Sequence, residues 1–328
     1  ELMVYSRPWK SFPEQLELLQ SRGMVVTDEA AALDYLARVG YYRLSAYWYP
    51  FRKFELEQNS GTGKLSTKAM DAFHKDTHFV DAVRLYLFDK QLRLCLADAL
   101  ERIEISLRVD LSYLLGKRSS FAHVENTKAH FHPGFANRPF RKDSQQSCFD
   151  AWLVKYRGLV ARSKEDFVRH HHDNHGDELP IWVAVEVLDF GAISQLFSML
   201  NVKDQLAIAN RYGVNDWQVF KSWLFSLSYF RNLVAHHSRL WNRNITSKPK
   251  LPKRGEIPWC DSFIGNEDTR FKPFLLLAIT RMLVKSICPN TQWHNRLAEH
   301  LDQFPELNSS KKLNLSGMGI TQDWREWW

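Results

Sequence analysis

The segment from Arg231 to Arg243 holds the residue types in this chain that are best suited to chemistry on a polyanion. It reads Arg-Asn-Leu-Val-Ala-His-His-Ser-Arg-Leu-Trp-Asn-Arg. Arginine stays charged at any physiological pH and can bind two phosphate oxygens at once. Histidine accepts and donates protons near neutral pH. Together these side chains could hold a phosphodiester, move its protons and stabilise its transition state without a metal.

The bare spacing of an arginine and a histidine is a weak signal. Short motifs produce false positives, and similar spacings occur at Arg118 with His123 and at Arg169 with His175. The segment at 231–243 differs because asparagines and further arginines surround its histidine pair. The alternative interpretation of this segment is a helix end whose basic side chains are only solvated.

A helix must position this segment. Apolar residues recur at helical spacing and predict a helix from about 216 to 240 with one buried stripe: Trp217, Phe220, Leu224, Leu227 and Val234. On such a helix Asn232 and His236 share a face, and Arg239 lies one turn beyond. Arg231 lies about 140° around the axis from His236. Its side chain must therefore curl round, or the partner groups come from a second copy of the chain.

The segment resembles the Arg-x4–6-His motif of HEPN ribonucleases in its RNxxxH form. The wider chain resembles Abi-like (abortive infection) proteins of the AbiD/AbiF type, through about residue 245. The other segments that carry the resemblance follow in order: Gly-Tyr-Tyr-Arg-Leu at 40–44, Tyr-Trp-Tyr-Pro-Phe-Arg at 47–52, Tyr-Leu-Phe-Asp-Lys-Gln-Leu-Arg at 86–93, Glu-Arg-Ile-Glu at 101–104 with Leu-Arg at 107–108, and Leu-Pro-Ile-Trp-Val-Ala-Val-Glu at 179–186. The chain is also similar to the HEPN domains of RNA-guided type VI CRISPR effectors.

This resemblance implies an all-α fold, a HEPN-like helical bundle that commonly pairs with a second copy. We expect an N-terminal helical module over 1–55 and the HEPN-like domain over 75–245. The domain contains an insertion at 117–178, which could be a lid, an RNA-contacting loop or a surface elaboration. A linker and a C-terminal helical extension occupy 246–328. Residues 57–64 form a polar loop, and the tryptophan-rich end of the chain is expected to dock on the protein.

Other residues are candidates for contact with RNA. Tyr42 and Arg43 belong to an aromatic, basic segment that could stack bases and grip phosphates; packing of these aromatics into a core is the favoured alternative. The resemblance places Glu101, Arg102 and Arg108 on a helix beside the catalytic one, where they would contact the substrate or position His236. Salt bridges, such as one between Arg108 and a glutamate four residues earlier, are an equal alternative.

Bulk properties agree with an RNA partner without proving one. The net charge is +7, the isoelectric point is near 9.1, and 13% of the residues are aromatic. The four cysteines lie far apart, which argues against a zinc knuckle or disulfide scaffold and for a cytoplasmic protein. No apolar run approaches a membrane span. The histidine run at 170–175 sits in an expected loop, so we predict no metal and no cofactor.

We therefore predict a metal-independent endoribonuclease of phage defence. Attack by the ribose 2′-hydroxyl on the adjacent phosphorus would restrict cleavage to RNA. Arg231 and His236 would be catalytic, with Arg231 on the phosphate and His236 as general base or acid. The supporting residues would orient His236, contact RNA or build the pairing surface: Asn232, His237, Arg239, Asn242 and Arg243. His236 is preferred over His237 because it shares a face with Asn232.

The expected partners are RNA, as substrate and as a regulatory non-coding RNA, and a second copy of the chain. Arg118 with His123 is a weaker choice for the second half of the site. Some HEPN toxins of toxin–antitoxin systems carry a modifiable tyrosine just after the catalytic histidine, but this chain has His237 and Ser238 there. The alternative function is a non-catalytic RNA-binding or scaffold protein of a defence system.

Overall fold

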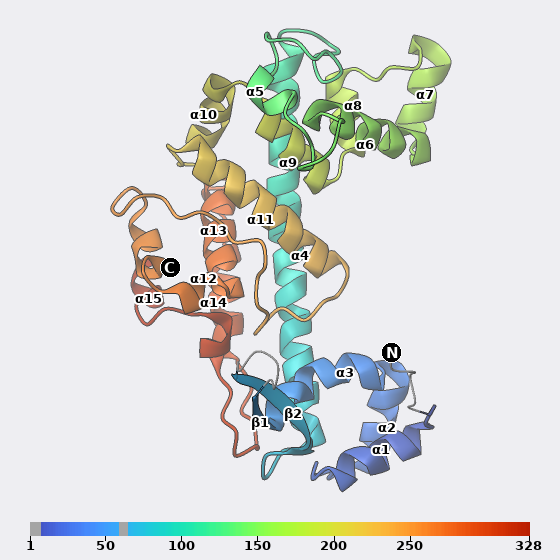
Figure 1. The fold of residues 1–328 in the computed structure, drawn as a ribbon, viewed down its shortest axis with the longest axis vertical. Coiled ribbons are helices and arrows are strands. Elements are labelled where there is room, and N and C mark those ends of the chain that lie inside the picture. Colours follow the sequence, from blue (N-terminus) through green and yellow to red (C-terminus); the bar gives the residue numbers. More distant parts are fainter. Residues whose placement is uncertain (1–7, 59–64) are drawn as a thin grey trace. The chain divides into compact units, whose positions relative to one another are not determined.

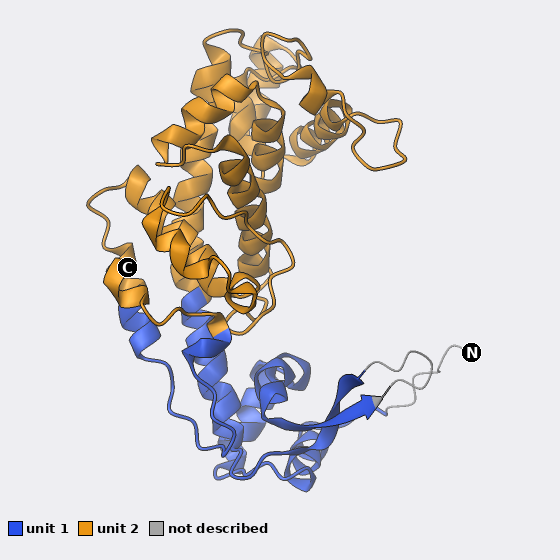
Figure 2. Ribbon diagram, turned by 60° about the vertical axis from the view of Figure 1, so that its left-hand side comes forward, with its two compact units in different colours: residues 1–92, 298–317 blue, residues 93–297, 318–328 orange. Residues whose placement is uncertain are grey.

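The computed structural model describes residues 8–58 and 65–328, and it is mostly helical (Figure 1). This confirms the all-α fold class. The chain divides into two compact units that are interleaved in sequence (Figure 2). The first consists of Glu1–Leu92 with Ala298–Gly317, and the second of Arg93–Leu297 with Met318–Trp328. The sequence predicts consecutive segments instead, so the interleaving is a finding of the structure.

Short helices with side-chain caps open the first unit. The Ser11 hydroxyl accepts a hydrogen bond from the Glu14 backbone, and the Glu14 carboxylate accepts one from the Ser11 backbone, which together form a capping box. Asp28 caps the next helix. The elements of this part are α1 (Phe12–Ser21), α2 (Glu29–Arg38), α3 (Tyr41–Trp48), the 3₁₀ turn η1 (Tyr49–Phe51), β1 (Arg52–Gln58), β2 (Leu65–Phe73) and the start of α4 (Phe79–Gly116).

Strands β1 and β2 form an antiparallel hairpin, the only sheet in the described part of the chain. This hairpin was not predicted, although Phe54 and Leu56 alternate with charged residues as is typical of a strand. Of the segment predicted as a polar loop, residues 57 and 58 belong to β1, and residues 59–64 lie outside the described residues. Most side chains of both strands are exposed. The alternation of residue types in β1 therefore does not correspond to one buried and one exposed face.

The aromatic segment at 41–54 mainly builds the core of the first unit. Tyr47, Trp48 and Phe51 are buried, and the Tyr47 hydroxyl donates a hydrogen bond of 2.8 Å to the buried carboxylate of Asp89. For these three aromatics the packing interpretation is confirmed. Tyr42 differs, because 90% of its surface is exposed.

The second unit is helical, and α11 (Trp217–Ala235) is central to it. Helix α11 packs against α9, α10 and α13, and its buried face includes the fully buried Trp223. The other elements that lie wholly or partly in this unit are the rest of α4, α5 (Pro133–Ala136), α6 (Cys148–Arg162), α7 (Asp166–His175), α8 (Ile181–Val187), α9 (Phe190–Met199), α10 (Val202–Arg211), η2 (Pro258–Phe263), α12 (Glu267–Arg270), α13 (Pro273–Ile287), α14 (Trp293–Asp302), η3 (Leu315–Met318) and α15 (Trp324–Trp327).

The segment predicted as a linker is held against α11. The Trp223 indole donates to the Lys250 carbonyl at 2.8 Å, and the Lys250 amide donates to the Ser222 hydroxyl at 2.7 Å. The tryptophan-rich end docks as expected: Trp328 stacks on Phe274, with the ring centres 5.6 Å apart. No described helix is both long and apolar enough to cross a membrane.

Candidate active site

Helix α11 ends five residues earlier than the sequence predicted, which changes the geometry of the motif. Its last helical residue is Ala235, and His236 caps it with its amide bonded to the Asn232 carbonyl at 2.9 Å. His237 then adopts a positive φ of 55°, and the Ser238 amide donates back to the Leu233 carbonyl. This is the left-handed turn that commonly ends a helix. The expectation that Arg239 continues the helical face is therefore wrong.

The loop after the helix is tied down on both sides. The Arg93 guanidinium donates to the Ser238 carbonyl at 3.3 Å, and the Lys272 ammonium donates to the Asn244 side chain at 2.8 Å. Burial lowers the pKa of Lys272, and the nearby charge of Arg239 lowers it further. The predicted supporting residue Arg239 thus belongs to a positively charged loop beside the helix end.

The last two supporting residues of the motif, Asn242 and Arg243, differ in their contacts. Burial raises the pKa of the Tyr229 phenol, but hydrogen bonds with Thr246 and Arg243 outweigh it and leave the pKa below its ordinary value. Arg243 is thus connected to α11. The side-chain oxygen of Asn242 is buried and has no hydrogen-bond partner in the described part of the chain.

Arg231 faces helix α4, where a buried carboxylate holds it. Its Nε lies 3.3 Å from an Oε of Glu104, whose side chain is 7% exposed, whereas that of Arg231 is 37% exposed. The interaction uses Nε, and within the described ranges the two terminal nitrogens make no hydrogen bond to another residue. Arg231 can therefore keep its place on Glu104 and still present a donor pair to a phosphate.

Glu104 is the centre of a charge network that the sequence analysis only partly anticipated. Arg108 donates to Glu104 at 2.8 Å, as its position four residues later predicted. Arg108 also bonds to Glu186 at 3.2 Å and to the Leu188 carbonyl at 2.8 Å, which ties α4 to the end of α8. The contact of Glu104 with Arg231 was missed. A signal existed, because this glutamate falls in the buried stripe of α4 between Ile103 and Leu107.

Asp189 adds a second carboxylate near Arg231. Burial raises the pKa of Asp189, but hydrogen bonds from Lys155 and from the Ala192 backbone, together with the charges of Lys155 and Arg231, bring the pKa below its ordinary value. Lys155 lies 2.7 Å from the Asp189 carboxylate. Arg231 therefore interacts with two carboxylates, those of Glu104 and Asp189.

Arg231, Glu104 and Arg108 border a groove of about 410 Å³ between α4 and α11. Its lining consists of Ala97, Leu100, Glu101, Glu104, Ile105, Arg108, Arg231, Val234 and Ala235. His236 is exposed at the helix end and does not line the groove. Of the two predicted catalytic side chains, Arg231 therefore lines the groove and His236 does not.

The other predicted RNA contacts are distributed over the molecule. Glu101 is exposed in the groove. Arg102 turns elsewhere, because it donates to Asp98 at 2.9 Å and to Thr291 at 3.3 Å. Arg108 is part of the charge network described above. Tyr42 and Arg43 are exposed on α3 in the first unit, whereas the groove belongs to the second.

The weaker choice for a second half-site, Arg118 with His123, does not have a reactive geometry. Arg118 binds both carboxylate oxygens of Asp204, at 2.8 and 2.6 Å. His123 is fully buried, and burial lowers its pKa to about 4 despite the charge of Glu125. Its ring contacts Tyr156 edge to face. This histidine is a core residue in the structure.

The histidine run at 170–175 lies on the second half of helix α7, so the expectation of a loop there was wrong. His171 bonds to the Glu178 carbonyl at 3.0 Å, and Asn174 lies 3.3 Å from the His170 ring. Among the residues that the structure describes, no group of three or more histidine, cysteine or acidic side chains is arranged to hold a metal ion.

Comparison with known proteins identifies a family. A family described as Abi-like protein matches residues 34–242, a range that contains the Glu104–Arg231 pair and the end of α11. No curated protein and no solved structure matches the chain. Because the matched range is more than half of the sequence, the chain belongs to the Abi-like protein family.

Proposed function

We propose that this Abi-like protein is a metal-independent endoribonuclease of phage defence, with a HEPN-type site of the AbiD/AbiF kind. The family suggests a role in abortive infection. The observation that carries the proposal is the placement of Arg231. A buried carboxylate fixes this arginine in an open groove, while an accessible histidine five residues later ends the same helix.

The chemistry follows from these two side chains. The guanidinium of Arg231 holds the scissile phosphate and balances the charge that builds up on its oxygens in the transition state. His236 removes the proton of the ribose 2′-hydroxyl or protonates the leaving oxygen, which is typically worth about 10²–10⁴ in rate. The 2′-oxygen forms the new bond to phosphorus as the 5′-oxygen leaves.

We infer that the complete site needs two copies of the chain, with Arg231 from one and His236 from the other. Within one copy, Arg231 lines the groove and His236 does not. A stripe of exposed apolar side chains on α4 runs on from the groove at Ile105 through Val109 to Tyr113, which is 77% exposed. Exposed apolar surface of this kind is typical of protein interfaces. It supports pairing next to the groove.

Control of the activity is also part of the proposal. The net charge of +7 favours a bound RNA as the regulator. Modification of a tyrosine after the histidine would need an acceptor that this chain lacks, because His237 and Ser238 occupy those positions.

The principal test is RNA cleavage by the wild type and by single variants. His236→Ala and Arg231→Ala are each expected to lose about 10²-fold or more in cleavage rate while keeping their helical signal and the ability to bind RNA. His175→Ala is the control, since it removes an exposed histidine of α7 that lies outside the motif; its rate is expected to stay within a few-fold of the wild type. If the wild type cuts no RNA after bound nucleic acid is stripped from it, the nuclease proposal is wrong.

Mixing the two inactive variants tests the pairing separately. In a mixed dimer of Arg231→Ala and His236→Ala chains, one of the two shared sites keeps both groups. Random pairing should then restore about one quarter of the wild-type rate. No recovery in mixtures shown by sedimentation to be dimeric would mean that each site is made within one chain.

A non-catalytic RNA-binding or scaffold protein is the second candidate. The ion pair of Arg231 with Glu104 favours it, because a neutralised arginine can serve structure alone. This candidate expects RNA binding without cleavage, and the same assays separate the two.

A further inference from the structure

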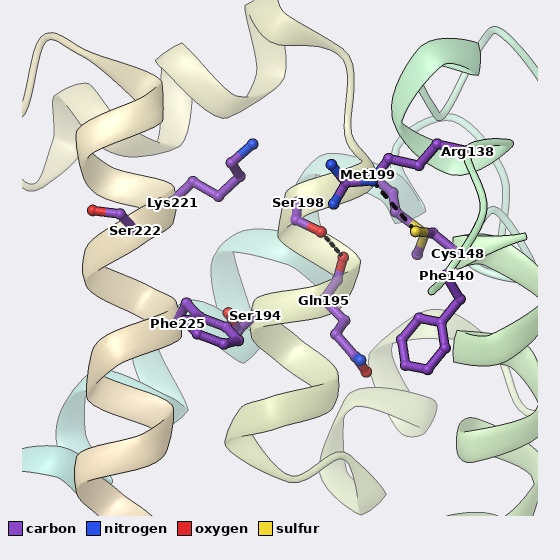
Figure 3. Close-up of a pocket in the computed structure, with 10 residues that line it drawn as sticks. All are labelled: Arg138, Phe140, Cys148, Ser194, Gln195, Ser198, Met199, Lys221, Ser222 and Phe225. Carbon is purple, nitrogen blue, oxygen red and sulfur yellow. Dashed lines mark hydrogen bonds between the residues drawn. The ribbon is translucent and has the colours of Figure 1, made fainter. Parts of the chain in front are cut away.

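A second concave site lies on the second unit, away from the groove of Arg231. It is a pocket of about 400 Å³ between α9, α11 and the segment that leads from residue 138 to α6. Figure 3 shows Lys221 of α11 and Arg138 of that segment reaching into the space from opposite sides. Pockets of this size accommodate small ligands or single nucleotides.

The two cations of the pocket have no anionic partner among the residues that the structure describes. No carboxylate in the described residues lies within 4 Å of Arg138 or Lys221, and no acidic residue lines the pocket. The Lys221 ammonium instead lies 4.8 Å from the ring centre of Trp217 and 5.3 Å from that of Phe135. Burial lowers the pKa of Lys221, and the charges of Arg138 and Lys250 lower it further. Such an accumulation of positive charge is unfavourable until an anion joins it.

Polar groups and aromatic rings complete the lining. Ser198 lies on α9 between the two cations, and its hydroxyl donates to the carbonyl of Gln195. The side-chain oxygen of Gln195 is buried without a hydrogen-bond partner within the described part of the chain. Phe225 and Phe140 line opposite sides of the pocket and are 64% and 40% exposed. Exposed rings beside a phosphate-sized cationic site are suited to stacking on a nucleobase.

We propose that this pocket binds a phosphorylated nucleoside, with the phosphate between Arg138 and Lys221 and the base against Phe225. The nucleotide is either free or the phosphorylated end of an RNA strand. Both sources present the same phosphate and base. The proposal concerns binding alone and holds whether or not the protein cuts RNA.

The test is titration calorimetry, which measures the affinity of the purified protein for adenosine 5′-monophosphate, inorganic phosphate and adenosine in separate titrations. The mononucleotide is expected to bind more tightly than phosphate, and adenosine to bind at least tenfold more weakly than the mononucleotide. Lys221→Gln and Arg138→Gln should each weaken both phosphate ligands about tenfold or more. Phe225→Ala should weaken the mononucleotide about tenfold but leave inorganic phosphate unchanged.

Two further variants control for effects of charge loss elsewhere and for loss of the fold. Lys203→Gln removes an exposed lysine of α10 that does not line the pocket, and it should leave every affinity unchanged. Lys221→Arg keeps the charge and should keep binding, which guards against loss of fold in the glutamine variant. Absence of mononucleotide binding at millimolar concentration, or equal affinities of the wild type, Lys221→Gln and Arg138→Gln, would overturn the proposal.

Competition identifies the source of the nucleotide. A short 2′-O-methylated oligonucleotide, which cannot be cut through its 2′-position, is added with a 5′-phosphate or with a 5′-hydroxyl. Displacement of the mononucleotide by the phosphorylated oligonucleotide alone supports an RNA end as the ligand. Displacement by neither oligonucleotide supports a free nucleotide.

Discussion

Helix α11 carries two cationic sites that differ in what balances their charge. In the groove, Arg231 is paired with the buried carboxylate of Glu104. In the pocket, Lys221 faces aromatic rings and a second cation, with no carboxylate among the lining residues. A phosphate that enters the groove must share its arginine with Glu104, whereas one that enters the pocket meets no competitor. Tight anion binding is therefore expected at the pocket, and a restrained, precisely oriented arginine at the groove.

Glu104→Gln would make the groove resemble the pocket. The substitution removes the charge that holds Arg231 and Arg108, so the free energy of unfolding is expected to fall by about 1–3 kcal/mol. RNA should bind several-fold more tightly, with a steeper dependence on salt, because Arg231 loses the carboxylate that it contacts and Arg108 keeps only Glu186. Chemical denaturation and RNA titration at several salt concentrations measure both effects.

The matched control is Glu101→Gln, which removes an exposed glutamate of the same groove. Its effect on stability should stay within about 0.5 kcal/mol. Equal RNA affinity in the wild type and both variants would show that Glu104 does not restrain the groove.

Ser198→Asp is the reverse change and would make the pocket resemble the groove. A carboxylate on α9 between Arg138 and Lys221 should occupy the phosphate position, so the affinity for adenosine 5′-monophosphate is expected to fall at least tenfold. Titration calorimetry measures this loss. Ser112→Asp is a close control, because both serines are half-buried and bond to the carbonyl three residues earlier. If the two aspartate variants bind the mononucleotide equally well, the phosphate does not lie between Arg138 and Lys221, and the proposed difference between the two sites is wrong.

The two sites should also differ in their response to pH. The affinity of the pocket for the mononucleotide is expected to change a few-fold. Phosphate binds the charged form of Lys221, so its affinity falls as pH rises through the pKa of that ammonium. Since burial and neighbouring cations lower this pKa, the fall begins below the ordinary value for lysine, near 10.5. Mononucleotide affinity measured between about pH 8 and pH 10 should decrease in the wild type and stay level in Lys221→Arg. A level wild-type profile would mean that Lys221 does not contact the phosphate.

The sequence predicted the parts of this molecule that rest on local patterns. The apolar stripe from Phe220 to Val234 identified α11, and the capping residues Ser11 and Asp28 fit the starts of their helices. The end of α11 was placed too late because the apolar pattern continues to Leu240. That residue is buried, but the chain reaches it through the left-handed turn at His237.

Contacts between distant segments were not predictable from such patterns. The pair of Glu104 and Arg231 joins residues far apart in sequence, and periodicity shows only that each lies on a helix. The pocket of Lys221 combines three elements in the same way. In α7, the run of histidines gave a polar stretch without the apolar repeat by which helices are recognised.

The interleaving of the two units bears on how the protein is made. The Asp81 carboxylate accepts hydrogen bonds from the Asn308 backbone and side chain, 227 residues later in the chain. A ribosome releases the whole segment from Arg93 to Leu297 between these two partners. Contacts of such long sequence separation form slowly, because a large loop must close first. The segment that bears Arg231 and His236 therefore emerges before the first unit can be completed. Truncation after residue 297 would remove residues 298–317, which belong to that unit.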